Sequence, residues 1–366
     1  MTFSPPPRNY ASDYMNFAKL RTAAKYGLAA SGVADCVMAD LDPRPEDFVL
    51  HGRNSYGYRP LMERIATRFA IPEACVVQGA GASFANHLAM AAILSPGDEV
   101  VIEAPAYELL LAALGYFQAE TRSVARRPQD AWALDTDAVI GAITPRTRLV
   151  VLTNLHNPTG ALTPPADLRA IAEAAERVGA LVLLDEIYLE LMFRDGVAHT
   201  AFRPEGNIVV TSSLTKAYGL SGLRCGWILA PAALAEKMRR LNDLFASIPA
   251  HVAEHLSVIA FDRLPALRLR ANAMIDANRA AYREILGRHP ALEQVILDQG
   301  TTVFPRLVSG DGEAFYRRLM ADYETSVVPG HFFGCPDRIR IGLAGDVAMT
   351  HIGLERIAEA LGSADP

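Results

Sequence analysis

The sequence predicts an α/β fold with a mainly parallel sheet, and three features of the chain point to it. Short uninterrupted runs of Val, Leu and Ile, such as Leu181–Leu184, are typical of strands that are covered on both faces. From about Cys75 onward, these runs alternate with helical periods, which is the pattern of strands joined by crossover helices. From about residue 250 the pattern changes to long helical periods and then to a weaker α+β stretch, which predicts a second, smaller domain.

The elements of the first part are bounded by turn residues. Ser95-Pro96-Gly97-Asp98 stops one helix, and Gly115 and Gly179 end two others. The expected strands are Cys75–Gln78, Glu99–Glu103, Leu149–Thr153, Ala180–Leu184, Ile208–Ser212 and Cys225–Leu229. The expected helices are Ser83–Leu94, Tyr107–Leu114, Asp167–Val178 and Ala232–Phe245.

The second part begins with a long helical period over His251–Arg288. It continues with a strand, a helix, a strand and a helix, over Thr302–Leu307, Gly312–Ala321, Arg338–Leu343 and Val347–Leu361. Residues 1–45 are irregular and Pro-rich at both ends, around an amphipathic stretch from Tyr14 to Ala30. We expect this segment to pack onto the second part. The prediction is therefore a large domain over residues 46–280 and a small, discontinuous α+β domain over residues 1–45 and 281–366.

Length and composition agree with two globular domains. The chain has 366 residues, of which 51% are hydrophobic and 21% charged, and domains average about 150 residues. The formal net charge of −6 argues against nucleic acid or an anionic membrane as the main partner. The first residues lack the basic and apolar regions of a signal peptide, and no apolar run approaches about 18 residues. We therefore expect a soluble, cytoplasmic protein.

The four cysteines are far apart in the sequence and include no CxxC pair. They form neither a zinc pattern nor a tight disulfide framework, so buried free thiols are expected. They are Cys36, Cys75, Cys225 and Cys335.

Polar segments follow five of the predicted strands, where open α/β sheets bind their ligands. Taken alone, each segment has an ordinary explanation: a tight turn, a core aromatic residue, a satisfied histidine such as His156, or a surface lysine. Taken together, they predict one site at the carboxyl edge of the sheet. The segments are Gln78-Gly-Ala-Gly-Ala-Ser83, Ala104-Pro-Ala-Tyr107, Asn154-Leu-His-Asn157-Pro-Thr-Gly160, Asp185-Glu-Ile-Tyr188 and Ser212-Ser-Leu-Thr-Lys216.

Lys216 is the strongest candidate for a nucleophile. Only four of the 35 basic residues are lysines, and Lys216 is the only lysine at a predicted strand end. Asp185 ends a buried apolar strand, where a carboxylate requires a cation. No cluster of His or carboxylate residues with ligand spacing accompanies it, so no metal site is expected. A lysine near a buried carboxylate and a loop that can bind phosphate is a candidate for a Schiff base.

The order and spacing of these segments resemble the class I/II aminotransferases, the fold-type-I enzymes that use pyridoxal 5′-phosphate. Asn157-Pro-Thr-Gly160 matches the family's Asn-Pro-[Thr/Ser]-Gly motif, and Asp185-x-x-Tyr188 begins 28 residues after Asn157. Lys216, in Ser213-x-x-Lys216, lies 31 residues after Asp185, and Arg224 follows 8 residues later. Arg338-Ile-Arg340 matches the family's late arginine-containing strand. The resemblance covers about residues 46–362 and implies a seven-stranded sheet in the large domain.

The resemblance also implies a role for each residue. Lys216 would form the Schiff base with the cofactor and move the proton, and Asp185 would pair with the protonated ring nitrogen. Arg340, with Asn157, would bind the substrate carboxylate by its planar fork. The other cofactor contacts are implied as Asn157 and Tyr188 at the phenolic oxygen, Tyr107 on the ring face, Ala82, Ser83, Ser213 and Arg224 at the phosphate, and Tyr56 at the phosphate of a partner subunit.

The implied activity is transfer of an amino group between an amino acid and a 2-oxo acid, by a homodimer with ping-pong kinetics. A second hypothesis keeps the cofactor but changes the outcome to a lyase, oxidase or cyclase reaction on a non-standard or guanidino amino acid. It rests on Met38–Pro43, which lacks the family's usual glycine, and on Ala30–Val33, which resembles arginine-modifying members of the superfamily. A regulatory domain that merely retains the cofactor site is the third hypothesis, which the acidic composition disfavours.

Overall fold

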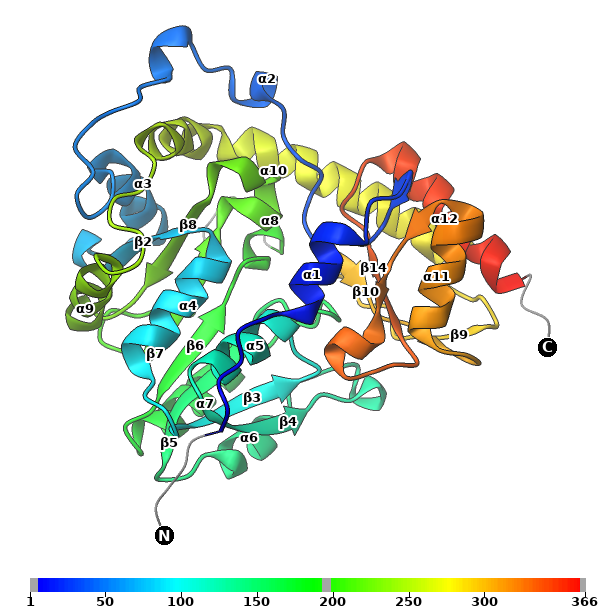
Figure 1. The fold of residues 1–366 in the computed structure, drawn as a ribbon, viewed down its shortest axis with the longest axis horizontal. Helices are drawn as coiled ribbons and strands as arrows, with labels where there is room; N and C mark the ends of the chain where they lie inside the picture. Colours follow the sequence, from blue (N-terminus) through cyan, green and yellow to red (C-terminus); the bar gives the residue numbers. More distant parts are fainter. Residues whose placement is uncertain (1–5, 193–198, 363–366) are drawn as a thin grey trace.

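A computed structural model describes residues 6–192 and 199–362. A seven-stranded sheet forms the centre of the larger part of the molecule (Figure 1). Its strand order is β2-β8-β7-β6-β5-β3-β4, and only β8 runs antiparallel to its neighbours. The sheet is therefore mainly parallel, as the sequence predicts. The strands are β2 (Val76–Ala80), β3 (Glu99–Ala104), β4 (Glu120–Ala125), β5 (Thr147–Thr153), β6 (Leu181–Asp185), β7 (Ile208–Ser213) and β8 (Cys225–Leu229).

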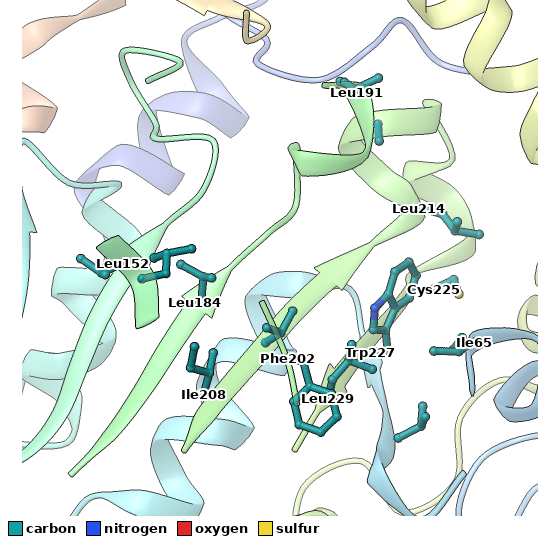
Figure 2. Packing of buried hydrophobic residues seen from close by; sticks show 14 of the residues in the cluster. Ile65, Leu152, Leu184, Leu191, Phe202, Ile208, Leu214, Cys225, Trp227 and Leu229 are labelled. Carbon is teal, nitrogen blue, oxygen red and sulfur yellow. The ribbon is translucent and has the colours of Figure 1, made fainter. Parts of the chain in front are cut away.

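Helices cover both faces of this sheet, which explains its apolar strands. Val182 and Leu184 of β6 pack on one face, whereas Leu183 between them packs on the other. The first face carries α3 (Arg59–Phe69), α6 (Thr136–Ala142), α7 (Pro165–Glu176) and the first half of α10 (His251–Ile285). The second face carries α4 (Ala82–Ile93), α5 (Glu108–Tyr116) and α9 (Ala232–Asn242). Figure 2 shows part of the first cluster, in which Trp227 and Leu229 of β8 lie near Phe202.

The sheet register places polar residues of three strands side by side. Thr153 of β5 pairs with Asp185 of β6, and Asp185 pairs with Thr211 of β7. The short helix α8 (Leu214–Tyr218) follows β7 directly and carries Lys216. The segments that the sequence analysis singled out therefore meet at one edge of the sheet.

The second part of the chain forms a smaller sheet with the order β10-β14-β13. Its strands are β10 (Thr302–Val303), β13 (Val328–Pro329) and β14 (Ile339–Gly342), and α11 (Gly312–Tyr323) and α12 (Val347–Gly362) pack on it. Short strands β9 (Leu292–Glu293) and β11 (Arg306–Leu307) pair with each other. The long helix α10 runs from the first part to the second (Figure 1).

The N-terminal segment contacts both parts. Helix α1 (Asp13–Leu20) packs against α5, and β1 (Tyr26–Gly27) pairs with β12 (Thr325–Ser326). Helix α2 (Met38–Leu41) follows farther along the chain. In Figure 1, α1 lies between the large sheet and the strands β10 and β14. These contacts do not test the domain boundaries, which stay a prediction.

Three details differ from the sequence-based expectation. The strand expected over Thr302–Leu307 is two short strands, β10 and β11, which have different partners and flank Pro305. Only the first part of the amphipathic stretch Tyr14–Ala30 is helical: α1 ends at Leu20, and Tyr26–Gly27 forms the short strand β1. Strand β4 was not predicted because it is a polar edge strand, with a single buried residue at Val124.

All four cysteines are free; Cys75 and Cys225 are buried, and Cys36 and Cys335 are half-buried. Within the described residues, no helix has the length and apolar character needed to cross a membrane.

Candidate active site

A narrow cavity lies at the carboxyl ends of β5, β6 and β7. Seven of the residues that the sequence analysis proposed line it, together with five that it did not. The predicted residues are Ala82, Ser83, Tyr107, Asn157, Asp185, Tyr188 and Lys216. The additional residues are Tyr14, Ser31, Asn86, Thr153 and Ile187.

Lys216 enters the cavity from α8, whose start is capped by Ser213. The Ser213 hydroxyl accepts a 3.2 Å hydrogen bond from the backbone N–H of Thr215. A Cβ at Gly32 would lie 2.8 Å from Cδ of Lys216, so only glycine allows the N-terminal segment to pass this close. Burial, followed by the positive charge of Arg340, lowers the pKa of Lys216 to about 8. This amine therefore loses its proton far more readily than an ordinary lysine, and a minority of it is neutral and nucleophilic near physiological pH.

Asp185 ends β6 with its carboxylate held by two donors. Asn86 Nδ2 donates to Oδ2 at 2.8 Å, and the backbone N–H of Ile187 donates to Oδ1 at 3.1 Å. Burial raises the pKa of Asp185 to about 6, against the opposing effect of these hydrogen bonds. The group is thus an anion above pH 6 that can pair with a proton donor in the cavity.

Arg340 of β14 is fully buried at the boundary between the two sheets. Its Nη1 donates to Oδ1 of Asn157 at 3.0 Å, and its Nη2 donates to the Tyr14 hydroxyl at 2.9 Å and to the carbonyl of Ala29 at 2.8 Å. The Nε atom is buried and has no partner in the described chain. Among residues 6–192 and 199–362 this buried guanidinium has an unused donor and no carboxylate partner, so it has the chemistry required to bind a carboxylate.

Two tyrosines form the walls of the cavity. Tyr107 packs edge-on against Tyr14, with ring centroids 5.4 Å apart. The Tyr188 hydroxyl donates to Oγ of Ser31 at 2.8 Å. Burial raises the pKa values of Tyr107 and Tyr188 well above those of ordinary tyrosines, so both hydroxyls keep their protons. These aromatic walls suit a flat ring between them.

The turn between β2 and α4 forms a cradle for an anion. Arg224 Nη2 donates to the carbonyl of Ala80 at 3.0 Å. A Cβ at Gly81, which has a φ of +82°, would lie 2.3 Å from that Nη2 atom. The first N–H groups of the 12-residue helix α4, at Ala82 and Ser83, face the same region. A helix N-terminus beside an exposed guanidinium is suited to a phosphate.

Tyr56 lies outside the cavity of its own subunit. Its side chain is 45% exposed, and its hydroxyl contacts Arg240 on α9 and Asp243 just after the end of that helix. The role expected for it at a partner's phosphate therefore stays a prediction. His156, which was expected to be structural, is buried and bonds Thr159 Oγ1 and the Pro105 carbonyl, each at 2.7 Å.

Sequence reasoning missed Tyr14 and Ser31 because both belong to the N-terminal segment, far along the chain from the strand ends. No local pattern marks Tyr14, and Ala30–Val33, which contains Ser31, was noted only for its resemblance to arginine-modifying enzymes. Asn86 carried a signal that could have been used. It lies three residues after Ser83 on a helix whose other buried residues are apolar, so its amide required a polar partner.

Comparisons with known proteins agree with this geometry. Residues 51–361 match the family model described as aminotransferase class I and II. The chain belongs to this family. It is 30% identical to a capreomycidine synthase from Streptomyces vinaceus, covering 93% of this chain and 90% of the relative. It is 31% identical to the arginine–pyruvate transaminase AruH of Pseudomonas aeruginosa, covering 86% of this chain and 82% of that protein.

Solved structures share the fold. A pyridoxal-phosphate-dependent aminotransferase from Streptococcus suis superposes with a TM-score of 0.86 at 22% identity, covering 96% of this chain and 97% of the other. The pyridoxal-phosphate-dependent cyclase OrfR superposes with a TM-score of 0.87 at 24% identity, covering 99% of both chains. The family thus has fold type I and uses pyridoxal 5′-phosphate as its cofactor. The amine, carboxylate, aromatic wall and anion cradle of the cavity fit that group.

Proposed function

We propose that the protein is an aminotransferase that moves an amino group between an amino acid and a 2-oxo acid by a ping-pong mechanism. The observation that carries this proposal is that Lys216 and Asp185 line one cavity and that Arg340 is hydrogen-bonded to Asn157, which also lines it. An amine, a buried carboxylate and a guanidinium whose Nε has no partner among the described residues are the groups that transamination requires from the protein.

Bound pyridoxal phosphate supplies an electron sink for the electrons released when the Cα–H bond of an amino acid breaks. In the proposed arrangement, Lys216 Nζ would hold the cofactor covalently and later carry the proton. Asp185 would keep a proton on the ring nitrogen, and Tyr107 would pack on the ring face. Asn157 and Tyr188 would bind the phenolic oxygen, while Ala82, Ser83, Ser213 and Arg224 would bind the phosphate. Arg340 would orient the substrate carboxylate so that the Cα–H bond faces Lys216.

A single-turnover reaction tests the proposal. The holoenzyme is mixed with one amino acid at a time, under anaerobic conditions and without a 2-oxo acid. Transamination predicts stoichiometric conversion of the cofactor to its pyridoxamine form, and release of one 2-oxo acid. Ammonia released while the cofactor keeps its aldehyde form, or a strict requirement for O2, would contradict it.

A second candidate function is a lyase, oxidase or cyclase reaction on a non-standard or guanidino amino acid. The similarity to a capreomycidine synthase over most of both chains favours it. The arginine named as substrate of the transaminase relative favours a guanidino amino acid as the substrate of either reaction. Arginine is therefore the first amino acid to test. A cyclised product without any pyridoxamine form would decide for this second function.

We further propose that the enzyme is a homodimer in which Tyr56 and the loop Ala246–His251 reach the partner. Large apolar side chains gather near this loop: Leu244 is 78% exposed and Ile248 is 57% exposed. Burial of these side chains in an interface of more than about 2,000 Å² would be typical of an obligate dimer. Sedimentation at micromolar concentration should give twice the chain mass, and a fully active monomer would refute the proposal.

A further inference from the structure

Asn86, on the second turn of α4, lines the cavity but has no role in the proposed reaction so far. Its side chain is 4% exposed. Nδ2 donates to Oδ2 of Asp185 at 2.8 Å, and Oδ1 accepts a 2.6 Å hydrogen bond from the hydroxyl of Thr211. The amide thus bridges β7 and the carboxylate at the end of β6.

We propose that Asn86, held by Thr211, is a positioning residue that keeps the Asp185 carboxylate oriented and ionised toward the ring nitrogen of the cofactor. This inference rests on the proposed function, since it assigns Asp185 to that nitrogen. Asn86 acts through Asp185 and needs no contact with the substrate.

The orientation of the amide follows from its two partners. If the amide were reversed, its oxygen would face Oδ2 of Asp185 at hydrogen-bond distance, and an ionised carboxylate would repel it. The Thr211 hydroxyl donates to the amide oxygen on the opposite side and so holds Nδ2 toward Asp185. With Nδ2 facing Oδ2, the hydrogen bond is stronger to the carboxylate than to the neutral acid, so the network favours the anionic form of Asp185.

The surroundings of Asp185 explain why such a donor is needed. Burial favours the neutral form of Asp185, and the negative charge of the nearby Glu103 on β3 acts in the same direction. The adjacent Glu186 is a second nearby acidic group. Lys216 on α8 is the cation that faces Asp185. The phenols of Tyr107 and Tyr188 remain neutral. Of the hydrogen bonds that favour the anion, only the one from Asn86 comes from a side chain.

The placement of Asn86 on α4 adds a geometric role. The first residues of this helix, Ala82 and Ser83, lie at the proposed phosphate cradle. One helix therefore positions both sets of donors: the first N–H groups for the phosphate and, one turn later, the Asn86 amide that orients the Asp185 carboxylate. An asparagine is otherwise unfavourable at this point, because it buries an amide within a helix of Ala, Leu and Met residues.

The test compares two cofactors on two matched variants. Asn86→Leu removes the amide, and His87→Leu changes the next, half-buried residue, which does not contact Asp185. Dissociation constants are measured by fluorescence for pyridoxal phosphate and for an analogue in which carbon replaces the ring nitrogen. Wild type and His87→Leu should prefer the natural cofactor equally. In Asn86→Leu the ratio of the two dissociation constants should fall about tenfold, which corresponds to the loss of one hydrogen bond to a charged group.

A spectroscopic measurement gives a second readout. The visible absorbance of the bound cofactor changes with pH as the proton at Lys216 Nζ is lost. A positive ring nitrogen favours that loss. We therefore expect the midpoint to rise by about 1 pH unit in Asn86→Leu and to stay unchanged in His87→Leu.

Equal weakening of both cofactors in Asn86→Leu, with an unchanged midpoint, would show a merely structural role and overturn the inference. If Asn86→Leu fails to fold, Thr211→Val decides instead. It is nearly isosteric and frees the amide to reverse, so it should shift the same preference and the same midpoint in the same direction; no shift would overturn the inference. A wild-type protein that binds no pyridoxal phosphate at Lys216 would refute the proposed function itself.

Discussion

Asn157 and Arg340 are joined by a hydrogen bond of 3.0 Å, although 183 positions separate them in the sequence. Asn157 follows a strand of the large sheet, whereas Arg340 lies in the small one. The bond therefore links the residue proposed to hold the phenolic oxygen of the cofactor to the residue proposed to hold the substrate. Binding of a carboxylate at Arg340 would therefore change the hydrogen bonding of Asn157, next to the cofactor.

Replacing Arg340 by lysine should raise KM much more than it lowers kcat. An ammonium group keeps the charge but cannot donate the parallel pair of hydrogen bonds that binds a carboxylate, and it leaves Asn157 and Tyr14 without their donor. We expect KM to rise at least about tenfold, the cost of one charged hydrogen bond. Steady-state kinetics at saturating 2-oxo acid measure this. Tyr14→Phe is the matched comparison, because it removes one partner of Arg340 and keeps the guanidinium. Unchanged KM in Arg340→Lys would remove this arginine from the carboxylate site.

Borohydride reduction of the holoenzyme should label Lys216 alone among the four lysines. Lys216 lies in the cavity with a pKa lowered to about 8, whereas Lys237 donates to the carbonyl of Ala92 on the outer face of the large sheet. Mass spectrometry of the digested protein locates the label. Lys216→Ala should still bind pyridoxal phosphate without covalent attachment, since the other contacts remain, and should have no measurable turnover. A label on Lys19, Lys25 or Lys237 would refute the assignment of the site.

Gly81→Ala should raise the dissociation constant for pyridoxal phosphate, beyond any loss of unfolding free energy that the substitution causes. A Cβ at Gly81 would lie 2.3 Å from Arg224 Nη2 and would displace the guanidinium from the cradle. Gly179→Ala is the control, because Gly179 also has a positive φ, of +75°, but has open space around it. Gly179→Ala should lose about 1 kcal/mol of unfolding free energy from backbone strain, and Gly81→Ala should lose more, because a φ of +82° with a ψ of 168° is essentially restricted to glycine. Only Gly81→Ala should raise the dissociation constant for pyridoxal phosphate, measured by fluorescence. Equal affinities in the two variants would show that Arg224 does not bind the phosphate.

The sequence allowed the large sheet and most of the cavity to be predicted because both depend on local patterns. The runs of apolar residues in β5, β6 and β7 end at Thr153, Asp185 and Ser213, so the polar residues that follow had to share one edge. Strand β4 escaped prediction because an edge strand does not require apolar residues on both faces. Tyr14 reaches the cavity only through the packing of α1 against α5 and against Phe332, which no local pattern encodes.

Glu186 should make the stability of the cofactor-free protein depend on pH. This residue follows Asp185 and accepts a 2.8 Å hydrogen bond from the N–H of Ala201. Burial raises its pKa from 4.5 to about 8. Between these values the folded protein holds a proton that the unfolded chain has lost. The contribution of Glu186 to the unfolding free energy therefore falls as pH rises, by at most about 1.4 kcal/mol per pH unit.

Glu186→Gln removes this dependence, because the amide still accepts from Ala201 and cannot ionise. Relative to wild type, the variant should gain stability steadily from about pH 5 to pH 8, and the difference should level off above pH 8. Urea unfolding of both proteins without cofactor at pH 5, 6.5, 8 and 9 measures this difference. The exposed Glu176→Gln on α7 is the control and should show none of the pH-dependent gain. A constant difference between Glu186→Gln and wild type across this range would mean that Glu186 is already ionised in the folded protein. Two adjacent buried carboxylates, Asp185 and Glu186, would then both be ionised, and positive charge beyond that of Lys216 would be needed to stabilise them.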